Sequence, residues 1–98
     1  MAIVELSVVP VGTGSASVSH YVRAALEVIS KSGLNFTVNP MGTCIEGELD
    51  RIFPVVKEIH ERLVGMGCAR LVTTIKIDDR RDKPQTMQEK VAKVKDNP

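Results

Sequence analysis

The hydrophobic periodicity changes in a set order along the chain, and this order restricts the possible folds more than any other feature of the sequence. Residues 3–9 alternate in steps of two, because Val4, Leu6 and Val8 form an apolar row and the residues between them are mixed. Steps of two are typical of strands with one buried face. The same step recurs in three further segments, which are 35–39, 42–47 and 70–77. Between the second and third strands, Asn39-Pro40-Met41-Gly42 has turn chemistry and predicts a hairpin.

Steps of three and four residues, typical of helices, lie between these strands. One stripe consists of Val18, Tyr21, Val22, Ala25, Leu26 and Ile29, with Ser15 or Ser17 as the expected N-cap. A second stripe begins near Glu48 or Asp50 and consists of Leu49, Ile52, Phe53, Val56, His60 and Leu63. The order strand, helix, strand, strand, helix, strand predicts an α+β fold. This is the ferredoxin-like βαββαβ sandwich, a four-stranded antiparallel sheet with two helices on one face.

The C-terminal segment differs in composition from the rest of the chain. We divide the chain into a ferredoxin-like domain, 1–78, and a charged linker with a C-terminal oligomerisation helix, 79–98. Thr86 and Glu89 have the spacing of a capping box before a short helix with an apolar stripe. Because a helix of about ten residues is marginal in water unless its stripe is packed, we expect another subunit to cover it.

The second face of the predicted sheet has no helix to cover it. Strand alternation places nine residues there: Ile3, Glu5, Ser7, Val9, Thr37, Asn39, Val72, Thr74 and Lys76. For the third strand two possibilities remain, Cys44 with Glu46 or Thr43 with Ile45. The apolar members of this face favour burial, so we expect the same face of a second copy to cover it. Buried polar side chains would then bond either to one another and to trapped water, or to a small polar ligand.

Composition excludes several classes of partner. Thirteen Lys and Arg against twelve Asp and Glu give a formal charge of +1, which provides no field for a nucleic acid or an anionic membrane. Two Phe and one Tyr are too few for a base-stacking platform. Cys44 and Cys68 lack metal-ligand spacing, and without a secretory leader they indicate reduced thiols in the cytoplasm. We predict no metal and no cofactor.

Catalytic arrangements are also absent from the sequence pattern. The sequence contains no recognisable Ser/His/Asp or Cys/His catalytic set. We expect His60 to be a core or rim histidine rather than a ligand-binding one. Glu5 and Glu46 would act as an acid/base pair only at a separation that the sequence does not specify. We therefore predict that the protein is not an enzyme.

Three segments carry a resemblance to a known family. They are Glu5-Leu6-Ser7-Val8-Val9-Pro10-Val11-Gly12-Thr13-Gly14, then Asn39-Pro40-Met41-Gly42-Thr43 with Glu46-Gly47, and finally 72–82, which reads VTTIKIDDRRD. Together they resemble the small thiamine-binding protein family, over essentially the whole chain. The resemblance implies a ferredoxin-like domain that pairs through its sheets, often as a dimer of dimers. It also implies a non-enzymatic protein that binds thiamine or its hydroxymethylpyrimidine moiety.

Combining these motifs with the open face gives a hypothesis for the site. Its expected ligand-binding residues are Glu5, Ser7, Val9, Asn39, Met41, Thr43, Glu46 and Thr74, with Ile3 and Val72 as further apolar walls. Glu5 or Glu46 would accept from the aminopyrimidine or offset the cationic thiazolium ring. The alternative function is an effector-binding regulatory module of the amino-acid-sensing type, an interpretation that rests on fold analogy. An enzyme that uses the two glutamates and a purely structural oligomer are a third and a fourth hypothesis.

Overall fold

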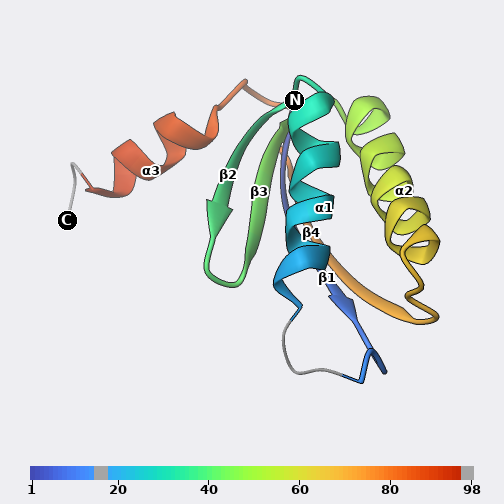
Figure 1. Cartoon of the computed structure of the whole chain (residues 1–98). Coiled ribbons are helices and arrows are strands. Elements are labelled where there is room, and N and C mark those ends of the chain that lie inside the picture. The colour runs from blue at the N-terminus through green and yellow to red at the C-terminus, as the bar shows by residue number, and fades with distance from the viewer. Residues whose placement is uncertain (15–17, 96–98) are drawn as a thin grey trace.

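The protein, in a computed structural model that describes residues 1–14 and 18–95, forms one antiparallel sheet with helices packed on it. The elements are β1 (Ala2–Pro10), α1 (Ser19–Lys31), β2 (Asn35–Asn39), β3 (Gly42–Gly47), α2 (Leu49–Gly65), β4 (Leu71–Asp79) and α3 (Met87–Lys95). The strand order is β2-β3-β1-β4, and α1 and α2 cover the same face (Figure 1). The predicted ferredoxin-like α+β fold is therefore confirmed.

The strand register separates the two faces of the sheet. Val4 lies opposite Ile45 of β3 and Ile77 of β4, and both Val4 and Ile45 are completely buried under the helices. The opposite face, which we call the open face, carries the alternate residues. These are Ile3, Glu5, Ser7, Val9, Asn35, Thr37, Asn39, Cys44, Glu46, Val72, Thr74, Lys76 and Asp78. The register decides between the two possibilities for the third strand, because it puts Cys44 and Glu46 on the open face and Thr43 under the helices.

The helices bury only part of the predicted stripes, since Ile29, Ile52 and Leu63 are buried together with residues outside those stripes. In α1 the buried residues are Ala24, Val28 and Ile29, whereas the predicted core residue Val22 is exposed. In α2 they are Ile52, Val55, Ile59 and Leu63, whereas Phe53, a member of the predicted stripe, is exposed. Apolar residues occur in adjacent positions of α2, so two stripes about 100° apart compete for the core. Because α2 packs on α1 as well as on the sheet, the stripe facing both is the buried one.

Polar contacts at the helix ends agree with the predictions only in part. The predicted caps Ser15 and Ser17 lie outside the described residues, and the N-cap position of α1 is Val18, which makes no side-chain capping bond. Thr86 caps α3 as predicted, since its Oγ1 accepts from the Glu89 backbone N–H at 3.1 Å. His60 lies at the rim, as expected, with its Nε2 2.6 Å from Thr73 Oγ1.

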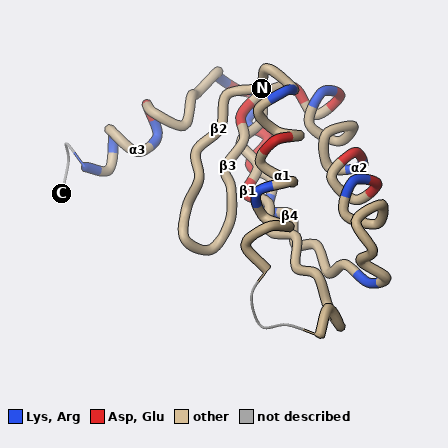
Figure 2. Tube along the Cα trace, in the orientation of Figure 1, with Lys and Arg blue, Asp and Glu red and all other residues tan. Residues whose placement is uncertain are grey.

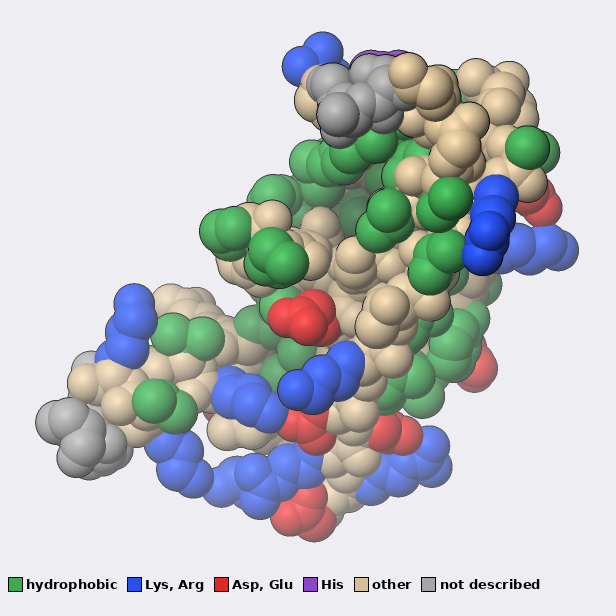
Figure 3. Space-filling view, turned by 90° about the horizontal axis from the view of Figure 1, so that it is seen from below, with side chains coloured by type: hydrophobic (Ala, Val, Ile, Leu, Met, Phe, Trp, Pro, Cys, Tyr) green, Lys and Arg blue, Asp and Glu red, His purple; other side chains and the backbone are tan. Residues whose placement is uncertain are grey.

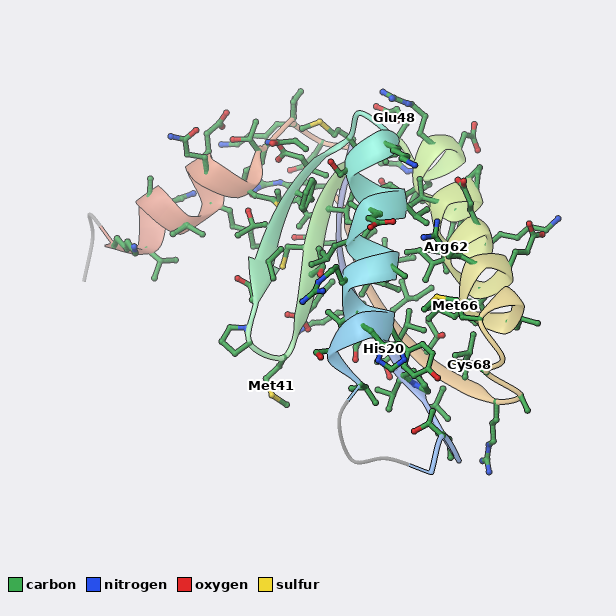
Figure 4. All side chains as sticks on the ribbon, viewed as in Figure 1. His20, Met41, Glu48, Arg62, Met66 and Cys68 are labelled. Atoms are coloured by element: carbon green, nitrogen blue, oxygen red, sulfur yellow. The ribbon has the colours of Figure 1, made fainter. Side chains whose placement is uncertain are left out.

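The surface carries charges of both signs, which are mixed along α1 and α2 (Figure 2). One ion pair, between Arg62 and Glu27, joins the two helices at 3.0 Å, and Arg62 extends toward α1 in Figure 4. The third helix, α3, projects away from the sheet (Figure 1) and buries none of its described residues. Among the described helices, none is long and apolar enough to cross a membrane.

Candidate functional site

A gap in the sheet separates the end of β1 from the β2-β3 hairpin tip. The pairing of β1 with β3 ends at Leu6 and Thr43, whereas its pairing with β4 continues to Pro10. Gly42 passes very close to β1 at this point, because a Cβ built on it would lie 2.9 Å from the Leu6 carbonyl oxygen. In the described part of the chain, residues 7–10 therefore have a strand partner on one side only.

A cavity of about 310 Å³ lies between this end of β1, the hairpin tip and α1, and we call it the slot. Its α1 wall is apolar and includes Tyr21, Ala25 and Leu26. Its polar lining residues include Ser7, Asn39 and Thr43, which come from β1 and the hairpin. Seen from below in Figure 3, hydrophobic side chains gather at this end of the molecule, whereas charged side chains gather nearer α3.

The backbone of residues 7–10 adds polar groups to the slot. Each non-proline residue of a strand carries one N–H and one C=O, and these groups need partners when they are removed from water. Among the described residues, every fully buried side-chain nitrogen or oxygen has a hydrogen-bond partner. The slot therefore suits a flat, largely apolar ring whose edge offers both donors and acceptors to a strand backbone.

Tyr21 closes the α1 side of the slot without contributing a free acid or base. Burial raises the pKa of the Tyr21 hydroxyl. The charge of Cys68 and a hydrogen bond with its side chain raise this pKa further. Its ring packs against His20, with 3.9 Å between the ring centroids. His20 and Cys68 lie at the same end of the helical layer in Figure 4. The hydroxyl stays neutral near pH 7 and acts as part of the wall.

A second cavity, which we call the face cavity, lies on the open face beside the start of α3. Its volume is about 320 Å³, and its lining includes Ile3, Glu5, Lys76, Met87 and Val91. Asn39 lines both this cavity and the slot, and its Nδ2 is 3.2 Å from Cys44 Sγ. Asn39 is therefore a lining residue that the two cavities share.

Glu46 holds the beginning of α3 in place. Its side chain is on the open face, but the residue is only 9% exposed. One carboxylate oxygen accepts from Asn35 Nδ2 at 2.5 Å, and the other accepts from the Met87 backbone N–H at 2.6 Å. An ion pair between Lys90 and Asp78 supports the same junction. Glu46 is thus engaged within its own chain.

The structure brings together most of the residues predicted to form the site, although not all of them. Ser7, Val9, Asn39, Met41 and Thr43 line the slot, and Met41, which is 89% exposed, projects from the hairpin tip (Figure 4). Glu5 lines the face cavity instead. Thr74, opposite Ser7, and Glu46 line neither cavity.

The sequence reasoning missed the wall that α1 supplies. Tyr21, Ala25 and Leu26 belong to the predicted helical stripe, but periodicity alone does not distinguish a residue in the core from one at the edge of a cavity. These residues line a cavity because the pairing of β1 with β3 ends at Leu6. As for metals, no group of three or more His, Cys, Asp or Glu side chains within residues 1–14 and 18–95 is arranged to hold an ion.

Comparisons with known proteins agree with this architecture. The sequence matches the family described as thiamine-binding protein over residues 4–95. A UPF0045 protein of Methanothermobacter thermautotrophicus is 43% identical over 97 residues, which is 98% of each chain. The hypothetical protein MJ1052 of Methanocaldococcus jannaschii superposes with a TM-score of 0.86 at 41% identity, covering 96% of this chain and 95% of the other. A Thermotoga maritima protein, TM0486, provisionally assigned to thiamine biosynthesis or salvage, gives a TM-score of 0.80 at 31% identity, with coverages of 95% and 97%.

Proposed function

Because this chain belongs to the thiamine-binding protein family, we propose that it binds thiamine or its pyrimidine moiety without altering it, and that the slot holds the pyrimidine ring. The family supports small-molecule binding in general, and the slot supports this particular ligand and place. The observation that carries the proposal is the backbone of residues 7–10, which pairs with β4 but not with β3 and lies next to an apolar wall.

The chemistry of an aminopyrimidine matches this environment. The ring is flat and apolar on its faces, while one edge carries an amino donor beside ring-nitrogen acceptors. A strand backbone offers the complementary groups, and the polar residues Ser7, Asn39 and Thr43 line the slot beside it. A volume of about 310 Å³ is at the small end of ligand pockets, which suits a ligand with one or two rings.

Filling the slot should abolish this binding. Ala25 lies in the α1 wall, so Ala25→Leu extends a larger side chain into the space that the ring would occupy. We expect at least a tenfold weaker affinity for both thiamine and hydroxymethylpyrimidine, measured by isothermal titration calorimetry. Ser30→Leu is the matched control, because Ser30 is an exposed residue of the same helix and does not line the slot.

Three outcomes decide the proposal. Unchanged affinity in Ala25→Leu, with the variant folded by circular dichroism, would move the ligand out of the slot. If the wild-type protein gives no heat and no thermal shift with either compound at millimolar concentration, the thiamine assignment itself is wrong. A thermal shift with a single amino acid and none with thiamine would favour a regulatory module instead.

The open face supports a further part of the proposal, that the protein is a homo-oligomer paired through its sheets. Val9 and Val72, which are opposite each other in β1 and β4, are each 47% exposed on this face. An apolar surface of this kind is stabilised when a second sheet covers it. The pairing would place a second copy beside the slot and the face cavity, and two such dimers could form a tetramer.

Sedimentation equilibrium tests the assembly directly. We expect a mass of two or four chains at micromolar concentration. A Val72→Lys substitution should shift the distribution of masses toward the monomer, because it would bury a charge in the interface between the two sheets. A wild-type particle of 10.7 kDa across the whole concentration range would refute the pairing.

A further inference from the structure

Two cavities that share one lining residue suggest a ligand with two parts. Asn39 lines both the slot and the face cavity. On β1, Ser7 lines the slot and Glu5 lines the face cavity, and both side chains are on the open face. Residues two apart in a strand are separated by about 6.6 Å. A molecule with two small rings joined by a single carbon atom could therefore extend from one cavity into the other.

The two cavities differ in whether charged residues line them. None of the charged residues lines the slot, whereas Glu5, Lys76, Asp78 and Lys90 line the face cavity. Asp78 and Lys90 neutralise each other in an ion pair. Within the described residues Glu5 makes no side-chain hydrogen bond or ion pair, even though Lys76 lies opposite it in the register.

Glu5 is therefore the acidic group of the site that is available to a ligand. Glu46, the other candidate from the sequence, is already bonded to Asn35 and to the Met87 backbone. The surroundings of Glu5 also include apolar surface, since Ile3, Met87 and Val91 line the same cavity. A carboxylate beside apolar walls favours a cation whose charge is spread over a flat ring, rather than a compact, strongly hydrated ion.

We propose that Glu5 is the counter-charge for the cationic ring of the ligand, so that the slot recognises the neutral pyrimidine and the face cavity recognises the thiazolium of thiamine. This inference rests on the proposed function and deepens it, because it assigns a specificity-determining residue. The protein should consequently prefer thiamine to the free pyrimidine, and the preference should depend on one carboxylate.

Measuring the binding of two ligands to one variant isolates the contribution of the Glu5 charge to affinity. Glu5→Gln keeps the size of the side chain and removes its charge. Two unit charges about 4 Å apart interact weakly in water and several times more strongly near a protein surface, so we expect thiamine to bind about fivefold to tenfold more weakly. Binding of hydroxymethylpyrimidine, which carries no permanent charge, should change by less than about twofold. Added salt should weaken thiamine binding in the wild type more than in the variant.

Glu61→Gln is the control, since Glu61 is an exposed residue of α2 that lines neither cavity and its loss changes the net charge equally. It should leave both affinities unchanged. Equal weakening of both ligands in Glu5→Gln, or no weakening of either, would overturn the assignment of Glu5 while leaving the proposed function in place. Absence of binding by the wild type would instead refute the proposed function.

Discussion

Replacement of Ile45 by alanine should lower the free energy of unfolding by about 2–5 kcal/mol. Ile45 is completely buried in β3, between Val4 of β1 and Phe36 of β2, and it belongs to the core beneath the helices. The substitution loses the transfer free energy of the removed methyl groups and leaves a cavity that surrounding strands cannot easily close. Small domains have a total stability of about 5–15 kcal/mol, so the loss is a large fraction of the whole.

Urea denaturation followed by circular dichroism would measure this change. Val94→Ala provides the control, because Val94 is 72% exposed on α3 and its truncation should alter stability by less than about 0.5 kcal/mol. If Ile45→Ala and Val94→Ala were equally stable, the core would not be centred on β3. Oligomerisation adds to apparent stability, so both variants should be compared with the wild type at one protein concentration.

Gly42→Ala should also destabilise the protein, by about 1–3 kcal/mol, although it adds only one methyl group. The added Cβ would lie 2.9 Å from the Leu6 carbonyl oxygen, and this oxygen belongs to the backbone of a central strand. Neither atom can move without displacing the hairpin from β1. The same displacement would widen the slot, so ligand affinity should fall together with stability.

Gly65→Ala is the matched comparison for this variant. It makes the same chemical change at the end of α2, where a Cβ would meet no atom within 4 Å. Alanine is the better helix former by about 1 kcal/mol, so Gly65→Ala should be neutral or stabilising. Equal unfolding midpoints for the two variants would show that the hairpin yields at little cost, contrary to the close approach that we describe.

The sequence allowed most of the fold to be predicted because its strongest patterns are unambiguous. The row formed by Val4, Leu6 and Val8 has no competing pattern, so the two faces of β1 followed from it directly. In α2 the pattern was ambiguous, since Phe53 and Val56 compete with Val55 and Ile59. Only the neighbouring helix selects between those stripes, and a tertiary contact of this kind leaves no trace in the periodicity.

The site was less predictable, and the reasons are physical. Alternation placed Glu5, Ser7 and Asn39 on the open face, as the register confirms, but it left the side of Glu46 undecided and could not show that Glu46 is bonded within its own chain. Glu46 differs because α3, which is distant in sequence, brings the Met87 N–H to it. The slot exists because β1 has no β3 partner after Leu6, which pairs with Thr43. The point at which two strands part depends on the hairpin geometry rather than on hydrophobicity.

The position of β4 at one end of the sheet has a consequence for how the protein avoids aggregation. A nine-residue strand with one free side offers its backbone as a template on which foreign chains could add. Charged side chains oppose such growth, because stacked copies would place like charges next to one another. Lys76, Asp78 and Asp79 supply that repulsion in the C-terminal half of β4, so fibril growth, if it were to start in this protein, would begin from the uncharged stretch that precedes them.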